Sequence, residues 1–143
     1  MVCFLTSSAL AFTLGLRVRV VGKQAPRAEA PVVVCAPHTS FLDTLVVFLC
    51  RGSVVARIED SRTPFVSSVS LITQTIFVER RSEASRRAAG EAMVARATSA
   101  LPWARVFVFP EGTTTNGRAL ARSAHTSKAW ASLVSTNRFV PLA

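Results

Sequence analysis

A histidine and an aspartate five positions apart, His38 and Asp43, are residues whose types and spacing could do chemistry. Neutral imidazole, with a pKa of about 6.5, can accept a proton from a hydroxyl group near neutral pH. A carboxylate bonded to the other ring nitrogen would fix the tautomer and stabilise the imidazolium ion. The pair could therefore form a general-base dyad. The alternative is a capped loop between a strand and a helix, in which both residues are structural.

Two further reactive side chains, Arg80 and Glu111, also follow short apolar runs. In a parallel sheet the carboxyl ends of the strands lie at one edge, and α/β folds bind ligands in the crevice outside that edge. We therefore expect a base, a cation and a carboxylate to gather there. The runs that precede His38, Arg80 and Glu111 are "VVVCA" (32–36), "TIFV" (75–78) and "RVFVF" (105–109).

The segments between these runs have the lengths and patterns of helices, which predicts an α/β fold with a mostly parallel β-sheet flanked by helices. Ser82 is a candidate N-cap for the Ala-rich stretch that follows it, and Ser40 or Thr39 could cap the helix after His38. Helices are predicted over residues 41–50, 64–73 and 83–100. Further strands are predicted over 53–58 and over 17–22, where "RVRVVG" alternates polar and apolar residues.

The blocks that contain these residues resemble those of the glycerolipid acyltransferases. "HTSFLD" (38–43) is similar to the family's His-x-x-x-x-Asp block, "TIFVER" (75–80) to its middle block ending in Arg, and "VFPEGTT" (108–114) to its Phe-Pro-Glu-Gly-Thr block. The order and spacing agree, and the lysophosphatidylcholine acyltransferase branch is the most similar. The resemblance implies an acyl-CoA-dependent O-acyltransferase that transfers a fatty acyl chain to the free hydroxyl of lysophosphatidylcholine or a related lysophospholipid.

The resemblance also implies a role for each site residue. His38 would be the general base and Asp43 its carboxylate partner. Arg80 would pair with the phosphate of the lysophospholipid, as a guanidinium can in a bidentate way. No cofactor is implied beyond the co-substrate acyl-CoA, and no metal ion. The acceptor-binding residues would be Glu111, Gly112 and Thr113.

Simpler interpretations remain open for two of these residues. Arg80 begins "RRSEASRR" (80–87), which could be the solvated start of a helix. Glu111 could merely expose a charge in a Pro-Glu-Gly turn. A second possibility for the whole chain is a catalytically inactive relative that binds anionic membrane lipid.

Composition limits the classes of partner. Seventeen Lys and Arg residues against eight Asp and Glu residues give a net charge of +9, which favours anionic partners such as lipid surfaces, phosphate-bearing substrates or nucleic acid. Nucleic acid is disfavoured because the chain has no basic stripe interleaved with aromatic residues and no zinc-finger or RNP motif. Three cysteines without metal-ligand spacing, Cys3, Cys35 and Cys50, indicate buried, reduced thiols.

Residues 1–16, "MVCFLTSSALAFTLGL", carry no charge and are followed by Arg17 and Arg19. A spanning helix needs about 20 apolar residues, so this run is too short to cross a membrane. It could be an interfacial anchor, the end of a longer membrane segment or a buried core helix. We favour a membrane-associating helix, and the resemblance implies the endoplasmic reticulum membrane.

The chain of 143 residues has room for one domain. We expect a membrane-associating segment at 1–16, an acyltransferase domain at 17–116 and a divergent tail at 117–143. The tail lacks the Phe-Lys-x-Gly-Ala-Phe segment that the family resemblance predicts there. Gln74 stands about where many relatives have glycine, and Thr114 where arginine is common.

Overall fold

The computed structural model describes residues 2–19, 21–23, 25–40 and 42–116, and in them four strands form one parallel sheet. The strand order is β1-β4-β2-β3, and each adjacent pair is parallel. The prediction of a mostly parallel sheet is therefore confirmed. The strands are β1 (Val32–Val34), β2 (Gly52–Arg57), β3 (Ile76–Val78) and β4 (Arg105–Val108).

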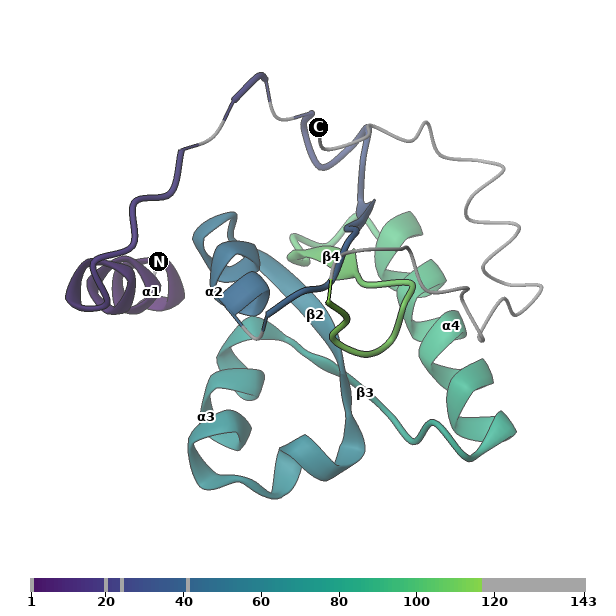
Figure 1. The fold of residues 1–143 in the computed structure, drawn as a ribbon. Helices are drawn as coiled ribbons and strands as arrows, with labels where there is room; N and C mark the ends of the chain where they lie inside the picture. Colours follow the sequence, from purple (N-terminus) through teal and green to yellow (C-terminus); the bar gives the residue numbers. More distant parts are fainter. Residues whose placement is uncertain (1, 20, 24, 41, 117–143) are drawn as a thin grey trace.

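Helices cover both faces of the sheet (Figure 1). The chain moves across the sheet in one direction from β1 through β2 to β3 and then returns from β3 to β4. Because such crossovers are right-handed, the reversal of direction places the last helix on the opposite face from the earlier ones. On one face lie α2 (Leu42–Leu49) and α3 (Pro64–Thr73), and on the other lies α4 (Glu83–Thr98).

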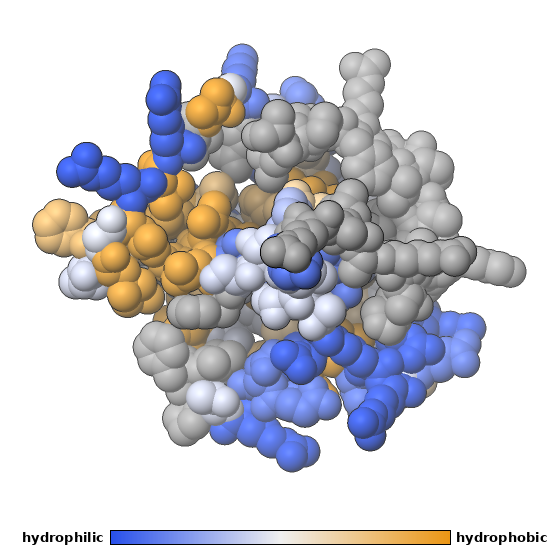
Figure 2. All heavy atoms as spheres, in the orientation of Figure 1, coloured by the Kyte–Doolittle hydropathy of each residue, from blue (hydrophilic) through white to orange (hydrophobic). Residues whose placement is uncertain are grey.

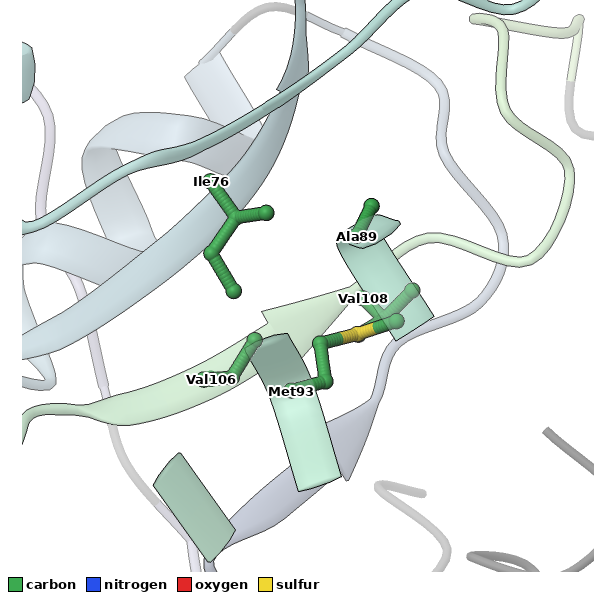
Figure 3. Close-up of a cluster of buried hydrophobic side chains, with 5 residues drawn as sticks. All are labelled: Ile76, Ala89, Met93, Val106 and Val108. Atoms are coloured by element: carbon green, nitrogen blue, oxygen red, sulfur yellow. The ribbon is translucent and has the colours of Figure 1, made fainter. Parts of the chain in front are cut away.

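The core has two parts because β4 sends alternate side chains to opposite faces. Val106 and Val108 pack with Ile76 and with the α4 residues Ala89 and Met93, as Figure 3 shows. On the other face Phe107 of β4 packs with Val47 of α2 and Val54 of β2. The central strand thus ties both helical layers to the sheet.

Local sequence signals define most helix boundaries. Ser82 caps α4, because its Oγ accepts a hydrogen bond from the N–H of Ser85 at 3.2 Å, as predicted. Pro64 occupies the first turn of α3, where its missing N–H costs nothing. The 3₁₀ helix η1 (Ile58–Arg62) leads from β2 to α3.

A polar cluster joins the amino ends of three strands. Gln74 ends α3 with a left-handed backbone, φ +57°, and its carbonyl accepts hydrogen bonds from Ser53 Oγ at 2.7 Å and from Arg96. Its side-chain Oε1 accepts a hydrogen bond from the N–H of Ala104 at 3.0 Å. These four residues, Ser53, Gln74, Arg96 and Ala104, are called the amino-edge cluster.

Two strand predictions were wrong in part. Residues 17–19, 21 and 22 form no strand; they are exposed, and no strand in the described part of the chain pairs with them. The apolar run 32–36 was expected to form a strand, but β1 covers only part of it and is half-buried. Its place at the edge of the sheet explains this exposure.

The apolar N-terminal segment forms α1 (Val2–Thr13), which packs against α2. Ala11 is buried, but several large apolar side chains are exposed, and Phe12 is 85% exposed. Figure 2 shows an apolar area over α1 at the left, flanked by hydrophilic residues. In the described part of the chain no helix is long and apolar enough to cross a membrane. The exposed apolar residues of this region include Leu5, Leu10, Phe12 and Leu14.

Candidate active site

The imidazole of His38 and the carboxylate of Asp43 are joined by a hydrogen bond of 2.8 Å between Nδ1 and Oδ2. His38 lies in the loop that follows β1, and Asp43 lies in the first turn of α2. Ser40 begins this helix, since its Oγ accepts a hydrogen bond from the N–H of Leu42 at 3.1 Å. The strand-to-helix turn therefore folds back far enough to bring the two side chains together.

Asp43 is fixed by the backbone of the same turn. Its Oδ2 also accepts hydrogen bonds from the N–H groups of Thr39 at 2.9 Å and Ser40 at 3.0 Å. Burial alone would raise the pKa of Asp43, but the hydrogen bonds from Ser40, His38 and Thr39 outweigh it and hold the pKa below its ordinary value. An ionised carboxylate can only accept hydrogen bonds, so Nδ1 of His38 carries a proton. In the neutral ring, Nε2 is then the basic nitrogen.

The Phe-Pro-Glu-Gly-Thr block holds His38 from the other side. Glu111, in the turn that follows β4, is buried, and its Oε2 accepts a hydrogen bond from the backbone N–H of His38 at 3.1 Å. Thr115 donates its N–H to the carbonyl of His38 at 2.7 Å and its hydroxyl to Oε2 of Glu111 at 3.1 Å. The four residues His38, Asp43, Glu111 and Thr115 are called the carboxyl-edge cluster.

Two features give this cluster a defined orientation and unused hydrogen-bonding capacity. The His38 ring stacks on Phe109, with 4.2 Å between the ring centroids and an interplanar angle of 23°. Oε1 of Glu111 is buried and has no hydrogen-bond partner among the described residues. A buried acceptor without a partner is costly, and such exceptions occur at sites where a ligand can supply the missing donor.

The other two residues of the block contribute differently. Gly112 has a φ of +64°, which a glycine adopts without strain, and its N–H donates to the carbonyl of Phe109 at 3.0 Å. Thr113 is exposed, and no hydrogen bond joins it to His38 or Glu111 within the described residues. The structure thus places both residues beside the cluster without giving Thr113 a contact in it.

Arg80 lies at the same edge of the sheet, as expected, but apart from the cluster. Arg80 follows β3, whereas His38 follows β1, and these are the two outer strands of the sheet. Because β4 and β2 lie between them, the outer strands are three strand spacings apart, about 14 Å. Burial, together with Arg57, lowers the pKa of Arg80, while Asp60 and Glu59 act in the opposite direction. The structure therefore does not bring Arg80 into contact with His38 or Asp43.

Cys35, three residues before His38, has the properties of a packing residue. It lies against the core of Val47, Val54 and Phe107. Burial raises its pKa to about 11, with smaller contributions from Cys50 and Asp43, so the thiol is protonated near neutral pH and is a poor nucleophile. Among the described residues, no three His, Cys, Asp or Glu side chains are placed to hold a metal ion together.

Sequence reasoning did not identify Phe109 and Thr115 as parts of the site. Phe109 belongs to the block that contains Glu111, Thr115 directly follows that block, and their types gave no separate signal. The stacking of Phe109 on His38 depends on how the end of β4 lies beside the loop after β1. Thr115 acts partly through its backbone N–H, which every residue except proline has.

The sheet, the two helical layers and the cluster at the carboxyl edge define an α/β protein with a hydrogen-bonded His–Asp pair beside its sheet. The chain matches the family described as "Acyltransferase" over residues 17–140, and it belongs to this family. The predicted boundary at residue 116 and the tail 117–143 stay predictions, because the tail lies outside the described residues.

Individual relatives agree with the branch that the sequence blocks indicated. The chain is 44% identical over 118 residues to "Lysophospholipid acyltransferase LPCAT4" of Mus musculus, covering 81% of this chain and 22% of the relative. It is 37% identical to "Lysophosphatidylcholine acyltransferase 2B" of Rattus norvegicus, covering 73% and 20%. It is 36% identical to "Lysophosphatidylcholine acyltransferase 1" of Danio rerio, covering 69% and 19%. The chain thus spans about a fifth of the length of these curated relatives, and no solved structure matches it with statistical significance.

Proposed function

We propose that the protein is an O-acyltransferase that moves a fatty acyl chain from acyl-CoA to the free hydroxyl of a lysophospholipid, lysophosphatidylcholine or a related one. The hydrogen bond of 2.8 Å between His38 and Asp43 carries this proposal, because it leaves Nε2 as the base for a substrate hydroxyl. The names of the relatives at 36–44% identity support the substrate class.

His38 acts as general base in the proposed reaction. Its Nε2 takes the proton of the acceptor hydroxyl while the oxygen attacks the thioester carbonyl. Asp43 holds the Nδ1–H tautomer and stabilises the imidazolium ion that forms. When the tetrahedral intermediate collapses, an ester C–O bond replaces the C–S bond, and the imidazolium returns its proton to the departing thiolate. No covalent enzyme intermediate is required, which agrees with the protonated, packed state of Cys35.

Substrate binding is assigned to the rest of the rim. Arg80 binds the lysophospholipid phosphate, and its position at the carboxyl edge, away from His38, leaves space for the glycerol backbone between them. Oε1 of Glu111 accepts a hydrogen bond from the acceptor, which would satisfy this buried oxygen. Gly112 lets the backbone approach the acceptor closely, and the exposed Thr113 offers a hydroxyl group.

The N-terminal region is proposed to lie on the endoplasmic reticulum membrane. The exposed apolar side chains of α1 suit the acyl boundary, and the exposed Arg17 and Arg19 that follow suit anionic headgroups. A surface-bound helix would place the carboxyl-edge cluster within reach of a lysophospholipid that remains in the bilayer.

The test is an acyl-transfer assay on the 143-residue chain in liposomes, with labelled acyl-CoA and a panel of lysophospholipids. His38→Ala should lower kcat by about 10³-fold, in the range reported for loss of a general base. His125→Ala, which removes the other histidine of the chain, is the matched control and should keep activity.

Two results would contradict the proposal. Turnover that survives His38→Ala would exclude His38 as the base. A folded wild-type chain that binds anionic liposomes but transfers no acyl group would favour the alternative, an inactive relative that binds membrane lipid.

A further inference from the structure

The backbone of His38 is held on both sides by the segment after β4. The N–H of His38 donates to Oε2 of Glu111 at 3.1 Å, and the carbonyl of His38 accepts from the N–H of Thr115 at 2.7 Å. Because both peptide groups next to the Cα of His38 are fixed, the direction in which its side chain leaves the backbone is fixed too. The imidazole can then meet Asp43 and Phe109 in one orientation.

The hydroxyl of Thr115 adds a second connection. It donates to the same Oε2 of Glu111 at 3.1 Å, so this oxygen receives hydrogen bonds from both His38 and Thr115. The other oxygen, Oε1, is buried without a partner in the described part of the chain. The Thr115 hydroxyl therefore helps hold the Glu111 carboxylate in the rotamer that meets the His38 N–H.

We propose that Thr115 is a positioning residue for His38 in the acyl-transfer reaction, acting through its own N–H and through the carboxylate of Glu111. It is a positioning residue and not a catalytic one in this assignment, because the hydrogen bonds that carry the argument join it to the His38 carbonyl and to the Glu111 carboxylate. The assignment rests on the proposed function, and it adds a residue that neither the motif nor the comparisons single out.

Two substitutions of Thr115 separate the hydroxyl from the packing of the side chain. Thr115→Val keeps the branched shape and the N–H but loses the hydroxyl, whereas Thr115→Ser keeps the hydroxyl and loses the methyl group. We expect Thr115→Val to lower kcat about tenfold, because a small misplacement of a base is costly, with KM changed less than about twofold. Thr115→Ser should stay within about twofold of wild type. The matched control is Thr114→Val, which replaces an exposed threonine one position earlier.

A second measurement does not depend on turnover. Amide hydrogen exchange of His38, followed by NMR, reports the bond to Glu111, and Thr115→Val should accelerate it about tenfold, whereas Thr114→Val should not. If wild type is inactive but exchange at His38 responds in this way, the proposed function fails, and what remains is that Thr115 orders the His38 backbone through Glu111. If wild type is active and Thr115→Val changes neither kcat nor exchange, the positioning role is overturned. Loss of activity in Thr115→Ser but not in Thr115→Val would also overturn it, since that pattern indicates packing.

Discussion

Polar side chains gather at both ends of the parallel sheet, and the two clusters use their hydrogen-bonding groups differently. In the amino-edge cluster the carbonyl and the side-chain oxygen of Gln74 both accept hydrogen bonds from neighbouring segments. In the carboxyl-edge cluster Oε1 of Glu111 is buried without a partner among the described residues, and Nε2 of His38 is left as a base. The first cluster joins strands, whereas the second joins two loops and leaves one buried carboxylate oxygen without a partner.

The difference has a physical origin in the direction of the strands. At the amino edge the chain enters β3 and β4 from Gln74 and Ala104, so the backbone groups there need partners and take them from nearby side chains. At the carboxyl edge the chain leaves β1 and β4 through loops whose side chains meet one another. Among the members of the two clusters, Glu111 keeps a buried oxygen without a partner in the described part of the chain, although Arg27, which donates to the carbonyl of Arg96, also has a buried unpaired Nε.

The largest expected effect is loss of activity on replacing Asp43 at the carboxyl edge. Asp43→Asn should lower kcat by about 10³-fold, because the amide can donate to Nδ1 and move the ring proton to Nε2, where no base then remains. The free energy of unfolding should change much less than the activation free energy. The acyl-transfer assay measures the change in activation free energy, and urea denaturation measures the change in the free energy of unfolding. An Asp43→Asn protein with wild-type activity would contradict the assignment of the carboxyl-edge cluster to function and of the amino-edge cluster to stability.

A smaller effect, on stability alone, is expected at the amino edge. Gln74→Ala should destabilise the fold by about 1–2 kcal/mol, because the N–H of Ala104 loses its acceptor while the positive φ is retained. Gln74→Gly loses the same bond but avoids the cost of a side chain at positive φ, about 1 kcal/mol, so it should be the more stable of the two. Urea denaturation checks this order, with activity retained in both. Equal free energies of unfolding for Gln74→Ala and Gln74→Gly would mean that a side chain at this positive φ does not destabilise the fold.

The smallest expected effect is a pH dependence of stability. The folded-state pKa of Asp43 is lowered, so its ionised form adds stability that is present above its unfolded pKa of about 4 and is lost as pH falls through the lowered value. The difference in Tm between wild type and Asp43→Asn should therefore be largest at pH 5 and above and should shrink below about pH 4. A difference that stays constant from pH 7 to pH 3 would show that the charge of Asp43 is not what stabilises the turn.

The sequence allowed much of the fold and of the candidate site to be predicted where local signals agree with the tertiary structure. Three signals identified the sheet and placed three reactive residues at one edge. They are the Ser82 cap, the apolar runs around β2, β3 and β4, and the alternation of helices with strands. The strand predicted over 17–22 was wrong because alternating polar and apolar residues form a strand only when a neighbouring strand is available. Spacing alone could not show that Arg80 stands three strands from His38, since strand order depends on the crossovers.

The position of β4 has a consequence for how the molecule assembles. β4 is the last described strand in the chain, yet it lies between β1 and β2, and His38 and Glu111 are 73 residues apart in sequence. Strands β1 and β2 do not pair with each other, and β4 joins them by pairing with both. The centre of the sheet therefore depends on a long-range contact, which raises the contact order and delays folding of the sheet during synthesis until β4 is available. The candidate active site thus forms together with the centre of the sheet.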